Sequence, residues 1–189
     1  MQPDAYILAG GKSLRFGEGD KALAMLDGQT LLERTAGLIR PQCRSITYVA
    51  ESLSRYKGFS DSVIADRLPA LGPLGGIDAA LRHQGNEPWA FICPCDLGYV
   101  GPAWLQSLTQ HATPESDAVV FRGERFEPLF TLYHRRILPL VEEHIHEQKL
   151  APHHLFPKIN SVILPLPPNW PTEPSFNTRE SLEAFKDKA

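Results

Sequence analysis

Residues 8–21 read Leu8-Ala9-Gly10-Gly11-Lys12-Ser13-Leu14-Arg15-Phe16-Gly17-Glu18-Gly19-Asp20-Lys21, and they follow an apolar run at residues 5–8. A strand that ends in glycines leaves backbone N–H groups uncovered by side chains, and such groups can bind phosphate oxygens. Arg15 and Lys21 add positive charge to the same stretch. The pattern therefore predicts a strand followed by a loop that binds the phosphates of a nucleotide.

Two common phosphate-binding templates do not match this stretch. A dinucleotide fold requires G-x-G-x-x-G, and a P-loop requires G-x-x-x-x-G-K-[ST]. The chain instead has Gly10 and Gly11, then Gly17 and Gly19, and its Lys21 is followed by alanine. An ordinary glycine-rich turn would not explain the charged residues at positions 15, 20 and 21.

The stretch resembles the signature L-A-G-G-x-S-x-R-(M/F)-G-x-x-D-K-(A/G)-L of the molybdenum cofactor guanylyltransferases, the MobA-like members of the nucleotidyltransferase superfamily. The resemblance extends from Tyr6 to about Phe185, essentially the full chain. It implies an α/β fold of the Rossmann-like three-layer nucleotidyltransferase type, with a predominantly parallel mixed sheet. It also implies a single domain over residues 1–189, which binds the nucleotide with its N-terminal part and the acceptor with its C-terminal part.

The resemblance also implies a reaction. The expected activity is transfer of GMP from GTP to the terminal phosphate of molybdopterin that already carries molybdenum (Mo-molybdopterin), with release of pyrophosphate. The product would be a guanine dinucleotide cofactor. GTP and Mo-molybdopterin are the expected substrates, and Mg²⁺ is the expected cofactor. Molybdoenzyme apoproteins or cofactor-synthesis proteins are the protein partners that this interpretation allows.

Composition narrows the class of protein. The 189 residues are 42% hydrophobic and 22% charged, values typical of a globular chain of one domain. The net charge of −3 argues against a nucleic-acid surface, which requires a basic face. The first residues lack the features of a signal peptide, and no apolar stretch is long enough to span a membrane. We therefore expect a cytoplasmic protein that does not contact membranes.

Apolar runs alternate with helical patterns, which predicts βαβ units and a parallel sheet. Thr30 with Glu33 three residues later predicts a helix N-cap, and Pro41 predicts the end of that helix. Expected strands lie at 5–8, 45–50, 62–65, 89–93, 117–122, 129–133 and 161–166. Expected helices lie at 31–39, 102–111 and 137–148, through 79–81 after a glycine-rich turn at 71–77, and after Thr178.

Nucleotidyl transfer requires neutralisation of the charge on the triphosphate. Within the family motif, Lys21 is the first candidate for a catalytic cation and Arg15 the second, and Gly10 and Gly11 would supply amide donors. Lysine and arginine are usually solvated surface charges. Their positions inside the motif favour a role in phosphate binding.

Asp96 is the candidate metal ligand and the third candidate catalytic residue. It follows the most apolar expected strand, in the phrase Cys93-Pro94-Cys95-Asp96. A carboxylate at the end of a strand suits a hard cation such as Mg²⁺, although a lone aspartate at this place more often caps a turn. The phrase resembles the P-C-D motif of the family, whose aspartate binds Mg²⁺, and this resemblance favours the metal ligand.

Five further residues correspond to positions that contact the nucleotide in the family. Leu8 and Ala9 end the first expected strand, and Asp66 ends the third. Gly75 and Gly76 match a loop near the guanine, where the absence of side chains would let the backbone approach the base. A role of these two glycines in forming a turn is equally compatible with their positions.

On the acceptor side, Asn177 lies in a segment that resembles the family phrase N-x-N-T-P-E-E-L. Two positions depart from that phrase, because Ser175 replaces its first asparagine and Arg179 replaces its proline. A third departure is Val49, at a position where the family often has an asparagine for the nucleotide. These departures affect the acceptor side and one base contact, and leave the phosphate and metal motifs complete.

Two other functions remain open from the sequence. Cytidylyltransferases and sugar-phosphate nucleotidyltransferases share the fold, but more often read Ala-Ala-Gly where this chain reads Ala9-Gly10-Gly11. A protein of another class could bind the nucleotide without catalysis, or deliver the molybdenum cofactor to an enzyme. Such a protein would bind the nucleotide without releasing pyrophosphate.

Histidines and cysteines suggest no further site. The four histidines at positions 144, 146, 153 and 154 match no zinc template, so metal binding there is a minor alternative. Cys93 and Cys95 are one residue too close for a C-x-x-C motif, which favours a packing role. With Cys43 they make an odd, sparse set that suits a reducing compartment.

Overall fold

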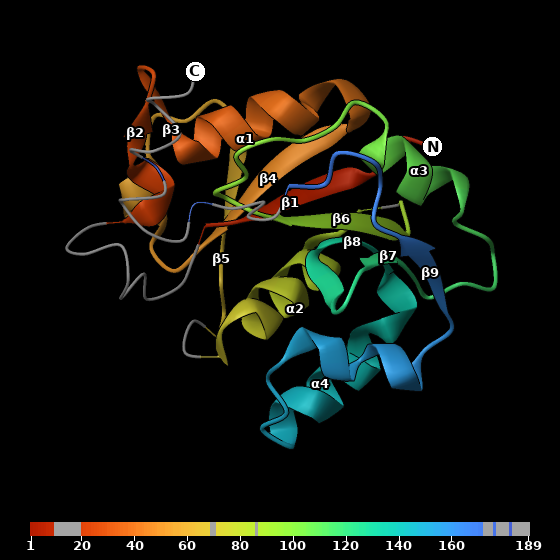
Figure 1. The fold of residues 1–189 in the computed structure, drawn as a ribbon. Helices are drawn as coiled ribbons and strands as arrows, with labels where there is room; N and C mark the ends of the chain where they lie inside the picture. The colour runs from red at the N-terminus through yellow and green to blue at the C-terminus, as the bar shows by residue number, and fades with distance from the viewer. Residues whose placement is uncertain (10–19, 69–70, 86, 172–175, 177–181, 183–189) are drawn as a thin grey trace.

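The computed structural model describes residues 1–9, 20–68, 71–85, 87–171, 176 and 182 of the chain. At the centre of this described part is a seven-stranded sheet in the order β5-β4-β1-β6-β8-β7-β9 (Figure 1). Its strands are β1 (Asp4–Leu8), β4 (Ser45–Ala50), β5 (Ser62–Ala65), β6 (Trp89–Pro94), β7 (Ala118–Arg122), β8 (Phe126–His134) and β9 (Ser161–Pro165).

Strand pairing is mostly parallel. Strands β5, β4, β1 and β6 pair in parallel, as do β7 and β9, whereas β8 is antiparallel to both β6 and β7. All five residues of β1 are buried, which is typical of a central strand covered on both faces. The predominantly parallel mixed sheet expected from the sequence is confirmed.

Helices cover both faces of the sheet (Figure 1). Ala5 and Ile7 of β1 face one hydrophobic core, which includes residues of α1 (Leu31–Ile39) and α3 (Trp104–Gln110). Tyr6 and Leu8 face a second core, built with α2 (Pro73–His83) and α4 (Leu138–His146). Because successive strand side chains point to opposite faces, one strand joins the two cores. The three-layer architecture is confirmed.

Helix α1 begins at the expected N-cap. The Thr30 hydroxyl accepts a hydrogen bond from the Glu33 amide at 3.1 Å, and the Glu33 carboxylate accepts from the Thr30 amide at 3.0 Å. Just before it, Asp27 and Gly28 have φ angles of 52° and 79° and join a short hairpin, β2 (Met25–Leu26) and β3 (Gln29–Thr30). An Asp-Gly pair is a typical turn sequence, whereas the two short strands that flank it were not among the expected strands.

The boundaries of α2, β8 and α4 are among those that differ from the sequence predictions. Helix α2 begins at Pro73, so the turn predicted at 71–77 is shorter than expected, and Gly75 and Gly76 lie in the first turns of the helix. Gly72 makes the turn with a φ of 59°, and proline is favoured at the next position because its φ is already helical. Strand β8 is longer than expected, and α4 ends before Gln148, whose φ is 59°.

Of the remaining predicted helix, after Thr178, only Leu182 is among the described residues, and it is helical and buried. Cys93 and Cys95 belong to the core with α1 and α3, as the packing interpretation predicted. Burial raises the pKa of both thiols. Within the described ranges, no helix is both long and apolar enough to cross a membrane.

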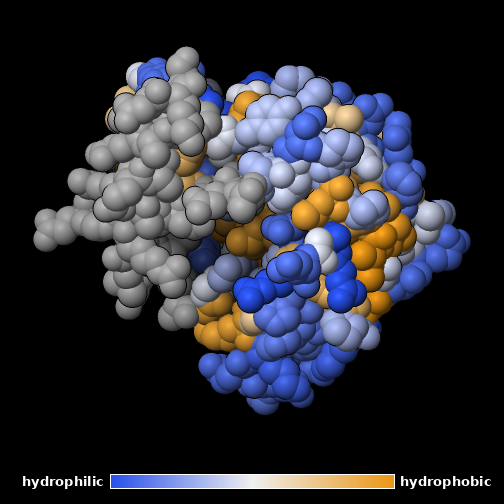
Figure 2. Space-filling model, in the orientation of Figure 1, coloured by the Kyte–Doolittle hydropathy of each residue, from blue (hydrophilic) through white to orange (hydrophobic). Residues whose placement is uncertain are grey.

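Helix α4 is amphipathic, and Figure 2 shows the mostly hydrophilic outer surface in its region. Val141 and His144 form its buried side, whereas Glu142 and Glu143 are exposed. Neither ring nitrogen of His144 has a hydrogen-bond partner within the described part of the chain. Burial lowers the pKa of His144, and the charge of Lys158 lowers it further. The folded protein therefore favours the neutral imidazole.

This histidine should make stability depend on pH. Below the ordinary histidine pKa of 6.5, His144 of the unfolded chain gains a proton, whereas His144 of the folded protein resists protonation. The free energy of unfolding should therefore decrease as the pH is lowered. In urea unfolding at about pH 7.5 and about pH 5.5, His144→Leu should reduce this loss by at most about 1.4 kcal/mol per pH unit. The control is His146→Leu, at an exposed position of the same helix. Equal pH dependence in the two variants would contradict the prediction.

Candidate functional site

The carboxyl ends of the parallel strands define the candidate site. In the sheet register, Leu8 at the end of β1 pairs with Val49 of β4 on one side and with Pro94 of β6 on the other. The chain leaves β1 toward β4 and β5, then returns to form β6 on the opposite side. Ligands of open α/β sheets bind at such a change of direction, outside the carboxyl ends of the strands.

Two predicted catalytic residues meet at this edge. Lys21 begins the short helix η1 (Lys21–Leu23), and Asp96 follows β6. The Lys21 Nζ atom forms an ion pair with Asp96 Oδ2, and both side chains are largely buried, at 15% and 6% exposure. The fold therefore brings the predicted phosphate-binding cation into contact with the predicted metal ligand, although the two residues are far apart in the sequence.

The loop that carries Asp96 is held by a helix that sequence analysis did not connect with it. The hydroxyl of Thr35, a fully buried residue of α1, donates to the Cys95 carbonyl at 3.1 Å and accepts from the Leu97 amide at 3.2 Å. These two backbone groups flank Asp96. The position of Thr35 on the apolar face of a predicted helix indicated a buried hydroxyl, but the sequence did not identify the groups to which this hydroxyl bonds.

A second contact comes from the C-terminal segment. The backbone amide of Phe176 donates to the Asp96 carbonyl at 3.0 Å, and its ring lies so close to Gly98 that a Cβ there would be 3.1 Å from it. Phe176 also packs with Leu26 and Leu31 in a small third core. The segment expected to bind the acceptor therefore reaches the loop that carries Asp96.

Asp66 lies at the end of β5, where its amide donates to the Ala50 carbonyl at 2.8 Å. Its Oδ1 atom accepts from the Leu68 amide at 2.8 Å. Burial raises the pKa of Asp66, and the charge of Glu51 acts in the same direction against the opposing effect of the Leu68 amide. Asp66 is therefore a half-buried carboxylate whose ionised form is disfavoured by its surroundings.

The two glycines of α2 allow close approach at the same edge. A Cβ at Gly75 would lie 2.5 Å from the Leu68 carbonyl oxygen and 3.0 Å from Asp66 Oδ1. A Cβ at Gly76 would lie 2.9 Å from Leu8 Cδ2. The absence of side chains thus lets the start of α2 contact the ends of β1 and β5.

Four of the predicted site residues, Gly10, Gly11, Arg15 and Asn177, lie outside the described residues. Ala9 is described, and its amide donates to the Val49 carbonyl at 2.8 Å, which extends β1 pairing by one residue. Within the described ranges, no group of three or more histidine, cysteine, aspartate or glutamate side chains is placed to hold a metal ion. The structure thus gives no support to a metal site among the C-terminal histidines that it describes.

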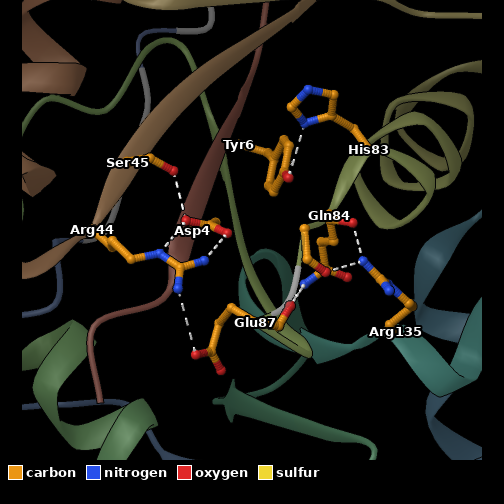
Figure 3. Close-up of polar contacts among 9 residues, drawn as sticks. Asp4, Tyr6, Arg44, Ser45, His83, Gln84, Glu87 and Arg135 are labelled. Carbon is orange, nitrogen blue, oxygen red and sulfur yellow. Dashed lines mark hydrogen bonds and ion pairs between the residues drawn. The ribbon is translucent and has the colours of Figure 1, made fainter.

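At the opposite end of the sheet, where the parallel strands begin, the polar contacts are different. Figure 3 shows Asp4 at the start of β1 with Arg44 and Ser45. Arg44 Nε donates to Asp4 Oδ1 at 3.0 Å, and the Ser45 hydroxyl donates to the same oxygen at 2.6 Å. Burial opposes ionisation of Asp4, but these hydrogen bonds outweigh it and lower its pKa. Tyr6 and His83 form a further contact at 3.2 Å. The polar side chains described at this end of the sheet therefore bond to one another.

Comparison with known proteins identifies the family. The family model of the MobA-like NTP transferase domain matches residues 5–158, most of the chain. The chain belongs to the MobA-like NTP transferase family. The match includes β1 from Ala5 onward, the whole of α2 and the Asp96 loop, and it ends before β9.

Individual relatives of this MobA-like domain agree. A molybdenum cofactor guanylyltransferase of Desulfosudis oleivorans is 36% identical over 146 residues, which are 77% of this chain and 72% of the relative. One of Photobacterium profundum is 38% identical over 144 residues, or 75% and 73% of the two chains. The crystal structure of molybdopterin-guanine dinucleotide biosynthesis protein A from Archaeoglobus fulgidus matches with a TM-score of 0.80 at 22% identity, over 98% and 97% of the chains. This last likeness confirms the fold.

Thr35 should stabilise the Asp96 loop of the MobA-like domain through its hydroxyl. Thr35→Val keeps the shape of the side chain but leaves two buried backbone groups without this partner, so the free energy of unfolding should fall by about 1–3 kcal/mol. Thr35→Ser keeps the hydroxyl and is the matched control. Urea unfolding measures both variants. A valine variant as stable as the serine variant would show that the two hydrogen bonds contribute little.

Gly75 should be intolerant of a side chain. Gly75→Ala places a methyl group against the Leu68 backbone and should lower the free energy of unfolding by about 1–3 kcal/mol. Gly37→Ala, in the exposed interior of α1 where a Cβ meets open space, should instead raise it by about 0.5–1 kcal/mol. Chemical denaturation compares the two variants, and a stabilised Gly75→Ala variant would refute the close approach.

Proposed function

We propose that this MobA-like NTP transferase transfers GMP from GTP to the terminal phosphate of Mo-molybdopterin and releases pyrophosphate. The observation that carries the proposal is the ion pair between Lys21 and Asp96 at the carboxyl ends of β1 and β6. Relatives at 36% and 38% identity that are named molybdenum cofactor guanylyltransferase support the same reaction. The proposed product is a guanine dinucleotide form of the cofactor.

In this reaction an oxygen of the acceptor phosphate attacks the α-phosphorus of GTP, the bond to the bridging oxygen breaks, and pyrophosphate leaves with that electron pair. The acceptor phosphate is already ionised at neutral pH, so the step needs no general base. Catalysis then depends on position and on neutralisation of charge. We assign neutralisation to Lys21 and Arg15, and amide donation to Gly10 and Gly11.

The donor set at Asp96 fits a divalent cation that takes most of its ligands from water and phosphate. Mg²⁺ commonly binds through one or two carboxylates together with substrate phosphates. Asp96 offers one largely buried carboxylate, and its contact with Lys21 shows that a positive charge is accommodated there. We propose Asp96 as the ligand of Mg²⁺, which would supply charge neutralisation beside the α-phosphate when bound.

For the nucleoside we propose contacts with Leu8, Ala9, Asp66, Gly75 and Gly76. The start of α2 brings its two glycines against Leu8 and the Asp66 turn, so these five residues come from segments that meet at one edge of the sheet.

For the acceptor we propose Asn177, because its neighbour Phe176 donates a backbone hydrogen bond to the Asp96 loop. The two substrates would then meet at Asp96.

Guanine specificity rests on the Ala9-Gly10-Gly11 sequence and on the names of the relatives, so a cytidylyltransferase remains the alternative within the fold. A nucleotide-binding protein that only delivers the cofactor is the alternative of another class. We place the reaction in the cytoplasm, with molybdoenzyme apoproteins or cofactor-synthesis proteins as the partners that receive or supply the cofactor.

Pyrophosphate release tests the proposal. With Mg²⁺, GTP and Mo-molybdopterin the protein should release pyrophosphate, and CTP, ATP and UTP should be poorer substrates. Asp96→Ala should lower turnover by about 10³-fold or more, because it removes the proposed metal ligand. Circular dichroism should show that the variant remains folded.

The matched control is Asp61→Asn. Asp61 also forms an ion pair, with Arg40 at 2.7 Å. It precedes β5, however, and so lies at the end of the sheet where the parallel strands begin. This variant should retain activity. Near-normal activity of Asp96→Ala would refute the metal assignment, preference for CTP would favour the cytidylyltransferase, and tight GTP binding without pyrophosphate release would favour the non-catalytic protein.

A further inference from the structure

Tyr56 contacts both residues that flank the segment 10–19. Tyr56 ends the short helix η3 (Leu53–Tyr56), which follows β4. Its hydroxyl lies 3.1 Å from the Ala9 carbonyl oxygen and 2.8 Å from Asp20 Oδ2. Ala9 directly follows β1, and Asp20 immediately precedes Lys21. A single buried side chain from η3, outside the sheet, thus contacts the last residue before that segment and the first residue after it.

The hydroxyl has one proton and faces two acceptors. Because Asp20 Oδ2 is the closer acceptor and carries charge, the proton is directed chiefly to the carboxylate, and the Ala9 carbonyl shares it at longer range. Burial raises the pKa of the Tyr56 hydroxyl above its ordinary value, and the hydrogen bond to Asp20 raises it further. The hydroxyl therefore remains a donor at physiological pH.

Asp20 transmits this contact toward Asp96. Its Oδ1 atom accepts from the Ala22 amide at 3.1 Å and so caps helix η1, while Arg55 Nη1 lies 3.6 Å from Oδ2. Lys21 is the first residue of η1, and its ammonium group forms the ion pair with Asp96. A continuous series of contacts therefore leads from the Tyr56 hydroxyl to the Asp96 carboxylate.

We propose that Tyr56 is a positioning residue for nucleotide binding. By bonding to Ala9 and Asp20, Tyr56 sets the distance between the two residues that flank the glycine-rich segment 10–19. It also sets the direction from which Lys21 reaches Asp96. The inference rests on the proposed function, because it takes this stretch to bind the phosphates of the nucleotide. No direct contact between Tyr56 and the substrate is implied.

Tyr48 provides a closely matched control. Like Tyr56 it is buried, its hydroxyl donates to an aspartate, Asp61, at 2.6 Å, and its ring contacts Phe59, with centroids 5.7 Å apart against 5.8 Å for Tyr56. Asp61 is bound to Arg40 and lies outside the candidate site. Tyr48→Phe and Tyr56→Phe therefore remove the same group from similar surroundings, and only the second removes a contact to the glycine-rich stretch.

The first test compares the Kd for GTP, the KM and kcat for GTP, and the Tm of the two variants in the full chain. Both substitutions should lower the Tm by similar amounts. Only Tyr56→Phe should weaken GTP binding, by about tenfold, with KM rising more than kcat falls. Equal GTP affinity in the two variants would overturn the proposal, because the hydroxyl would then have a structural role alone.

A double-mutant cycle tests whether Tyr56 acts through Asp20. If it does, Tyr56→Phe should weaken GTP binding far less in an Asp20→Ala background than in the wild-type chain. Additive losses would overturn the inference. Because binding is the readout, a chain that binds without turnover still gives an answer, and a chain that prefers another nucleoside triphosphate is tested with that nucleotide. Failure of the proposed reaction and failure of this inference are therefore distinguishable.

Discussion

Strand β1 must be covered on both faces and paired on both edges, and most of the architecture follows from this constraint. Its five residues are all buried, its side chains alternate between two hydrophobic cores, and its backbone pairs in parallel with β4 and β6. Parallel pairing requires crossover connections, which place helices on both faces of the sheet. The same pairing aligns the carboxyl ends of the strands, where the polar groups of the candidate site are found.

At that edge, several elements converge on one short loop. Helix α1 contributes the Thr35 hydroxyl, η1 contributes the Lys21 ammonium group, and the C-terminal segment contributes the Phe176 amide. All three contact residues 95–97, with Asp96 at the centre. Burial strengthens the interaction of this carboxylate with a cation, since water screens the charges less. A largely buried carboxylate at this place is suited to binding a cation.

Features that depend on neighbouring residues could be predicted from the sequence. The capping box at Thr30 and Glu33, the turn at Asp27 and Gly28, and the apolar runs of β1, β4 and β6 involve residues that are close in the chain. The resemblance to the family motifs placed Lys21 and Asp96 in one site, but the sequence did not predict the ion pair between them.

Features that depend on distant partners could not be predicted in this way. The Thr35 hydroxyl bonds to residues 60 and 62 positions away, and the Tyr56 hydroxyl bonds to a residue 47 positions away. No local pattern marks a buried hydroxyl as a loop anchor. The helical placement of Gly75 was also missed, since the start of α2 is set by the positive φ of Gly72.

The Tyr56 hydroxyl, from beyond β4, bonds to both Ala9 and Asp20, and the Thr35 hydroxyl of α1 bonds to the backbone on both sides of Asp96. The residues on either side of segment 10–19 therefore depend on side chains from other segments. Transplanted into an unrelated strand–helix scaffold, residues 8–21 would lose the hydrogen bonds from Tyr56 to Ala9 and Asp20 and the ion pair of Lys21 with Asp96. The host scaffold would also need an equivalent of Tyr56 and an equivalent of Thr35, placed on two further segments.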